Sequence, residues 1–166
     1  MDNIPFTPHF ELREFVDSPT ARDHGIDNTP PDEAVENLRT LCVHTLEPLR
    51  EKLERPIIIT SGFRTKALND ILVHAARKSQ HMEGRAADFY VSPSTGSGSR
   101  SRREMLIKAF RLIILEEDID FDQLILYPSF IHVSYVSREK NRRKITTANG
   151  HGTYCALSRD QALSIY

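Results

Sequence analysis

Two short segments of the sequence carry side chains that can act as metal ligands. The first is SQHMEGRAAD (residues 79–88), in which His81 and Asp88 lie on either side of a turn. The second is IHVSY (residues 131–135), an alternating strand pattern that sets His132 on the face opposite its apolar neighbours. Zinc accepts imidazole nitrogens and carboxylate oxygens at about 2.0–2.2 Å. His81, Asp88 and His132 therefore form a candidate ligand set.

None of these three residues is persuasive when taken singly. A lone histidine on an apolar strand, such as His132, is more often a core residue bonded to a backbone carbonyl. Asp88 by itself is typical of a turn or capping carboxylate. The combination carries the prediction, because Gly84 permits a tight turn and the small Ala86 allows close packing where the strand begins.

The spacing S-x-H-x-x-G-x-A-x-D at residues 79–88 resembles the signature of the D-alanyl-D-alanine peptidase superfamily. That superfamily includes zinc carboxypeptidases and dipeptidases of peptidoglycan, phage endolysin endopeptidases and the hedgehog signalling domain. TSGFR (60–64) is similar to the family's T-S-G-[YF]-R segment, and FIHVS (130–134) to its aromatic-x-His strand. The resemblance runs from about residue 37 to 135 and is greatest to short stand-alone peptidases of bacteria and their phages.

The resemblance implies that His81, Asp88 and His132 bind Zn²⁺ and leave its fourth position for water. Zinc lowers the pKa of such a water towards about 7 and polarises the carbonyl that is attacked. The implied substrate is a peptide of peptidoglycan, and the implied fold is that of the hedgehog and DD-peptidase domains.

Three further residues receive roles from the same resemblance. Arg64 is expected to point into the cleft and steady the oxyanion or the substrate's carboxylate, unless it forms a structural ion pair instead. Ser79 and Gln80 are expected to orient His81 rather than to react.

The sequence departs from the family where the general base is expected. In the family a glutamate stands shortly before the last ligand histidine, whereas QLILYPSFIH (123–132) contains no acidic residue. Tyr127 or Ser129 occupies that region, and neither is an effective base at neutral pH. The base could instead come from one of four side chains elsewhere, namely Asp122, Glu83, Glu139 and His151.

Two main functions follow from this pattern. The first is a zinc-dependent peptidase of the bacterial cell wall, of the D-Ala-D-Ala carboxypeptidase or endolysin-like endopeptidase type. The second is a zinc-binding pseudoenzyme or binding module, which the missing glutamate favours. A third hypothesis is a relic of the fold that binds no metal.

The amino-acid composition narrows the classes of function and the cellular locations that remain. The 166 residues are 39% hydrophobic, with 22 basic against 23 acidic side chains and a net charge of −1, so nucleic-acid binding is not favoured. Neither a signal peptide nor a membrane-spanning apolar run is visible, so we expect a cytoplasmic protein, or one released to the cell wall by a phage-type route. Cys42 and Cys155 make no disulfide framework, and Cys42 is expected to be buried.

Hydrophobic periodicity predicts one α+β domain over residues 1–166, with a small antiparallel sheet and flanking helices. We expect an irregular segment at 1–30, a mobile loop at 92–101 and a C-terminal extension at 137–166. Pro48 is expected to kink the first long helix. The predicted helices are 30–53, 66–77 and 102–117, and the predicted strands are 56–60, 85–91, 123–127 and 130–136, the last two as a hairpin.

Overall fold

The structure is a computed structural model and describes residues 3–73, 75–92, 99–149 and 152–165. Within these ranges six strands form one sheet in the order β1-β2-β4-β3-β5-β6. The strands are β1 (Ile57–Ser61), β2 (Ala86–Val91), β3 (Gln123–Leu126), β4 (Ile131–Ser134), β5 (Lys144–Ala148) and β6 (Tyr154–Leu157). The helices are α1 (Leu12–Val16), α2 (Pro19–Asp23), α3 (Asp32–Leu41), α4 (Glu47–Leu53), α5 (Lys66–Ile71), α6 (Ser99–Leu115) and α7 (Arg159–Leu163).

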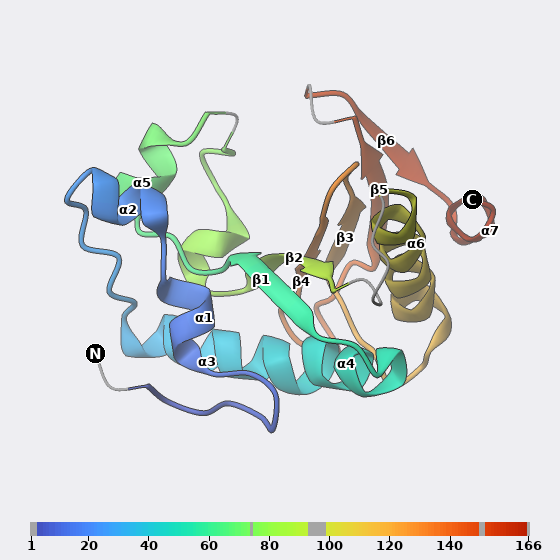
Figure 1. Cartoon of the computed structure of the whole chain (residues 1–166), viewed down its shortest axis with the longest axis horizontal. Coiled ribbons are helices and arrows are strands. Elements are labelled where there is room, and N and C mark those ends of the chain that lie inside the picture. Colours follow the sequence, from blue (N-terminus) through green and yellow to red (C-terminus); the bar gives the residue numbers. More distant parts are fainter. Residues whose placement is uncertain (1–2, 74, 93–98, 150–151, 166) are drawn as a thin grey trace.

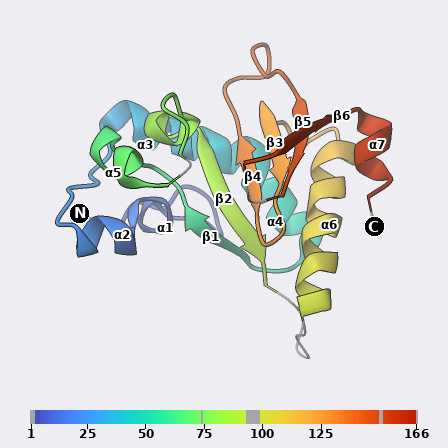
Figure 2. The ribbon, with the colours of Figure 1, turned by 90° about the horizontal axis from the view of Figure 1, so that it is seen from above.

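The predicted α+β class is confirmed. Each neighbouring strand pair is antiparallel except β3 and β5, which run parallel. The predicted hairpin is the β3–β4 pair. Figure 1 shows α1, α2, α3 and α5 towards one end of the molecule and α6 and α7 towards the other, where β5 and β6 also lie. The two chain ends are far apart in both views (Figures 1 and 2).

The first long helix contains an irregular turn. α3 is followed without a break by a π-helical turn, Cys42–Leu46, and then by α4. Pro48 lies in the first turn of α4. Proline has no N–H, so Pro48 cannot make the helical hydrogen bond to the carbonyl oxygen of His44, which accepts the N–H of Asp120 at 3.0 Å instead. The irregularity thus precedes Pro48, and the helix direction is continued rather than ended.

The sheet has one apolar face and one polar face, because side chains alternate along each strand. Ala87, Val133 and Leu124 are paired across β2, β4 and β3 and belong to the main core. That core face is covered by α3, α4 and α6, which contribute the buried residues Leu38, Leu41, Leu49, Leu106, Ala109, Phe110 and Ile113. In Figure 2 α6 runs alongside the strands, with α7 packed beside it.

The opposite face carries the next residue of each strand. Asp88, His132 and Ile125 form one row across β2, β4 and β3. The two faces therefore separate the packing core from the row that contains two of the three predicted ligands.

Several predicted boundaries change in the structure. The helix expected to reach residue 77 ends at Ile71, and the last long helix spans Ser99–Leu115. Residues 93–98 of the expected mobile loop lie outside the described residues. Helices α1 and α2 fall within the segment expected to be irregular, and β5 and β6 of the expected extension join the sheet.

Two further features concern the cysteines and the membrane. Cys42 and Cys155 are free thiols, Cys42 buried and Cys155 exposed. Among the described residues, no helix has the length and apolar character needed to cross a membrane.

Candidate metal centre

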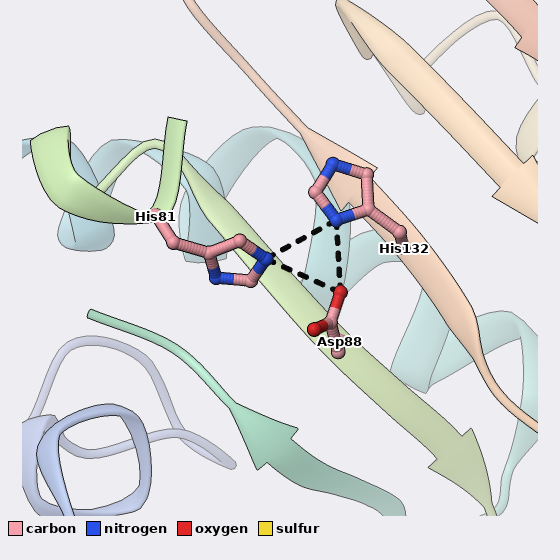
Figure 3. Close-up of side chains that lie close together, drawn as sticks. All are labelled: His81, Asp88 and His132. Atoms are coloured by element: carbon pink, nitrogen blue, oxygen red, sulfur yellow. Dashed lines mark hydrogen bonds and ion pairs between the residues drawn. The ribbon is translucent and has the colours of Figure 1, made fainter. Parts of the chain in front are cut away.

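His81, Asp88 and His132 meet on the polar face of the sheet (Figure 3). Asp88 on β2 lies directly opposite His132 on β4, so the antiparallel register alone brings this pair together. His81 comes from a 3-10 helix, Gln80–Glu83, in the segment that leads into β2. The structure thus joins the three residues that the sequence predicted as ligands.

The three facing atoms form a triangle with sides that suit a tetrahedral ion. His81 Nε2 lies 3.2 Å from His132 Nδ1 and 3.3 Å from Asp88 Oδ1. Ligands held at about 2.0–2.2 Å from a tetrahedral zinc ion are about 3.3–3.6 Å apart. The remaining side, His132 Nδ1 to Asp88 Oδ1, is a 2.8 Å hydrogen bond. A metal ion at this position would take the place of that hydrogen bond, with the hydrogen of His132 on Nε2 instead of Nδ1.

The ring of His81 is held in the orientation that a ligand needs. Its Nδ1 lies 2.6 Å from the carbonyl oxygen of Gly62, which can only accept, so Nδ1 carries the hydrogen and Nε2 keeps its lone pair. The side chain is fully buried, and this burial lowers the pKa of His81. Gly62 is itself pressed against Phe15, since a Cβ at Gly62 would lie 2.5 Å from the Phe15 carbonyl oxygen.

The turn between the first two ligands depends on Gly84 and Ser79. Gly84 has φ +69° and caps the 3-10 helix, and a Cβ there would lie 2.3 Å from the carbonyl oxygen of Ala34. Ser79 Oγ accepts the backbone N–H of His81 at 3.4 Å, at the start of the same helix. Ser79 therefore holds the backbone of His81 through a hydrogen bond, while the carbonyl group of Gly62 holds its imidazole ring.

Asp88 is oriented by Arg64. Nη2 of Arg64 donates to Asp88 Oδ2 at 2.8 Å, and its Nε donates to Ser61 Oγ at 2.9 Å. Burial raises the pKa of Asp88, but the contacts of its carboxylate with His81 and His132 outweigh burial and hold the pKa well below its usual range. In this structure Arg64 therefore forms an ion pair with Asp88, one of the three candidate ligands.

Gln80 has a different partner from the one expected. Its Nε2 donates to Asp122 Oδ2 at 2.9 Å, so it ties the 3-10 helix to the start of β3 rather than bonding the ring of His81. The carboxylate of Asp122 is buried and also accepts the backbone N–H, Nε and Nη2 of Arg142. The oxygens of Asp122 are therefore occupied by structural hydrogen bonds.

The other candidates for the general base are Glu83, Glu139 and His151. Glu83 is exposed and paired with Arg85, and Glu139 is exposed beyond β4. Among the described residues, no hydrogen bond or ion pair joins any of the three carboxylates Asp122, Glu83 and Glu139 to the candidate ligands. Ser129 is exposed in the β3–β4 turn. His151 lies outside the described residues.

Tyr127 lies beside the ligand row, together with Tyr154, a residue that no sequence motif marks. The hydroxyl of Tyr127 is 3.2 Å from that of Tyr154 on β6, and its ring stacks on Phe130 with centroids 4.2 Å apart. Because Tyr154 belongs to no local pattern, only the pairing of β5 with β6 could reveal it.

Comparison with known families supports the interpretation of this site. Residues 8–111 match the family described as Peptidase M15, a span that includes Arg64, His81 and Asp88. A search of curated proteins finds no match. The matched span ends before His132, which the fold then brings to the other two ligands. Because the family match covers well over half of the chain, this protein belongs to the M15 family of zinc-dependent D-alanyl-D-alanine peptidases.

Proposed function

We propose that this protein is a zinc-dependent peptidase that cleaves peptides of bacterial peptidoglycan. The observation that carries the proposal is the triangle of His81 Nε2, Asp88 Oδ1 and His132 Nδ1, in a chain of the M15 family. Two imidazoles and one carboxylate are a donor set found in catalytic zinc sites, which keep a fourth position open.

The three side chains would hold the ion, which would supply Lewis-acid polarisation of the scissile carbonyl together with an activated water. His81 and His132 bind through opposite ring nitrogens, Nε2 and Nδ1. Asp88 binds through Oδ1, because Arg64 occupies Oδ2. Each ligand thus presents one defined atom to the metal position.

Arg64 has donor capacity left for substrate. Its Nε and Nη2 bond Ser61 and Asp88, and Nη1 makes no hydrogen bond among the described residues. A guanidinium beside the metal position suits the carboxylate of a peptide that ends in D-alanine. If Arg64 binds the C-terminal carboxylate of the substrate in this way, the protein acts as a carboxypeptidase on peptides that end in D-alanine.

The test is hydrolysis of defined cell-wall peptides by metal-loaded protein. A pentapeptide stem that ends in D-Ala-D-Ala, a tetrapeptide and a cross-linked dimer are incubated with the protein, and the products are identified by mass spectrometry. We expect cleavage with zinc, none after chelation, and recovery on adding zinc back. His132→Ala is the matched inactive variant, and His24→Ala, at an exposed histidine directly after α2, is the control. If all three peptides stay intact, the peptidase proposal is wrong.

A second function is favoured by one observation, namely that none of the candidate carboxylates Asp122, Glu83 and Glu139 contacts the ligand group within the described residues. A family member of this kind would use zinc to bind a peptide rather than to cut it. Isothermal titration with the same three peptides separates the two functions: binding without cleavage supports the binding module.

A further inference from the structure

Tyr127 lies on the same face of the sheet as the candidate ligands. Ile125 is paired with His132, and Tyr127 follows Ile125 by two residues, so its side chain emerges on the ligand side. The backbone N–H of Tyr127 donates to the carbonyl oxygen of Phe130 at 3.0 Å, which continues the β3–β4 ladder one step beyond Leu126. The position of the tyrosine is therefore set by the same hairpin that carries His132.

The side chain of Tyr127 is held on two sides. Phe130 stacks against one ring face, with the planes 12° apart. Tyr154 meets the hydroxyl at 3.2 Å, and its ring lies edge-on to that of Tyr127 with centroids 6.3 Å apart. The parallel pairing of Leu126 with Thr147 and the antiparallel pairing of Ala148 with Tyr154 set both tyrosines on the same face of the sheet.

The electrostatic surroundings of Tyr127 favour the protonated form of its hydroxyl. Burial and the negative charge of Asp88 raise the pKa of Tyr127 well above that of an ordinary tyrosine, although Arg64 opposes the shift. The phenol therefore stays protonated and can donate a hydrogen bond. If Tyr154 donates to the oxygen of Tyr127, the hydrogen of Tyr127 is free for another acceptor.

We infer that Tyr127 donates this hydrogen bond to the carbonyl oxygen of the scissile peptide, and that Tyr154 positions it. The inference rests on the peptidase function proposed above. Negative charge accumulates on the carbonyl oxygen as the carbonyl carbon becomes tetrahedral, and a fixed donor stabilises that charge. Tyr127 keeps its proton throughout, so it acts as an oxyanion donor and does not replace the missing glutamate as a base.

The experiment removes single hydroxyl groups. The variants are Tyr127→Phe, Tyr154→Phe and the double substitution. Tyr90→Phe is the matched control, because Tyr90 lies on β2 two residues from Asp88 but its ring packs on Arg102. The measurements are kcat, KM, zinc content, thermal midpoint, and affinity for a phosphinic peptide that mimics the tetrahedral intermediate.

For Tyr127→Phe we expect kcat to fall about a hundredfold, with KM, zinc content and thermal midpoint close to those of the unaltered protein. The affinity for the phosphinic peptide should fall by about the same factor. Tyr154→Phe should lower kcat about fivefold, as for one neutral hydrogen bond, and the double variant should be no slower than Tyr127→Phe alone.

The outcomes separate this inference from the proposed function. If the unaltered protein cleaves a cell-wall peptide but Tyr127→Phe retains its kcat and its affinity for the phosphinic peptide, the inference is overturned and the peptidase function stands. An increase in KM alone would also overturn it, because that result assigns Tyr127 to ground-state binding. If the unaltered protein neither cleaves peptides nor binds the phosphinic peptide, the proposed function itself fails.

Discussion

Arg64 and Asp88 share one hydrogen bond that decides which carboxylate oxygen faces the histidines. Nη2 of Arg64 lies 2.8 Å from Asp88 Oδ2, whereas Asp88 Oδ1 lies 2.8 Å from His132 Nδ1 and 3.3 Å from His81 Nε2. The side chains of Arg64 and Asp88 are each only 13% exposed, so solvent screens the pair weakly. The arginine thus fixes the carboxylate for single-atom ligation.

Loss of the Arg64 guanidinium should weaken zinc binding. We expect Arg64→Gln to raise the Kd for zinc about 10–100-fold, because Asp88 is then free to rotate and no partner holds Oδ2. Competition with a chromophoric chelator measures the change. The control is Arg22→Gln, which removes an exposed arginine paired with Asp17. An unchanged zinc Kd in Arg64→Gln would show that Asp88 is oriented by other contacts.

Gly84 should tolerate no side chain. Gly84→Ala places a Cβ 2.3 Å from the Ala34 carbonyl oxygen and also carries the cost of positive φ. Gly25→Ala is the matched control, because Gly25 has φ +61° and nothing within 4 Å of the added Cβ. We expect Gly25→Ala to lower the free energy of unfolding by about 1 kcal/mol and Gly84→Ala by about 3 kcal/mol. Urea unfolding measures both, and equal losses would contradict the contact with Ala34.

Zinc should stabilise the protein without being required for its fold. The core lies on the opposite face of the sheet from His81, Asp88 and His132, so the chain folds around α3, α4 and α6 with or without metal. At free zinc about 100 times its Kd, the free energy of unfolding should rise by about 2.7 kcal/mol.

Thermal unfolding with and without chelator measures the effect of zinc, and His132→Ala should abolish the difference. His24→Ala, at an exposed residue, should preserve it. A protein that is unfolded after chelation would assign the metal a structural role instead.

The Asp122–Arg142 pair should make stability depend on acid pH. Burial raises the pKa of Asp122, but hydrogen bonds from Arg142 and Gln80 outweigh burial and leave the pKa below its usual value. A carboxyl whose pKa is lowered by folding stabilises the protein above its unfolded pKa, about 3.9, and loses this contribution as pH falls through the folded pKa.

Asp122→Asn is therefore expected to be less stable than the unaltered protein by about 1–3 kcal/mol at pH 7, and the gap should narrow below about pH 4. Urea unfolding between pH 3 and 7 gives the difference at each pH. A gap that is constant across this range would show that packing, rather than the charge of Asp122, is responsible.

The sequence alone predicted the ligand set and the elements next to it. His81, Gly84 and Asp88 lie within eight residues, and their spacing reflects a local turn whose geometry the chain dictates by itself. Alternation in IHVSY likewise predicted that His132 leaves the core face. These predictions succeeded because turn conformation and strand alternation are properties of neighbouring residues.

Tertiary structure decided the partners of the other side chains. Gln80 was expected to orient His81 but bonds Asp122, and Arg64 is paired with Asp88. Tyr154 lies beside Tyr127 because β5 pairs with β3 and β6 pairs with β5.

Hydrogen-bond partners that are 24 to 42 residues apart in sequence depend on strand order and register, which no local pattern encodes. The sequence therefore indicated which residues are candidate metal ligands. The fold determined which residues orient those side chains and which hydroxyl group contacts Tyr127, because both follow from the packing of distant strands onto one sheet.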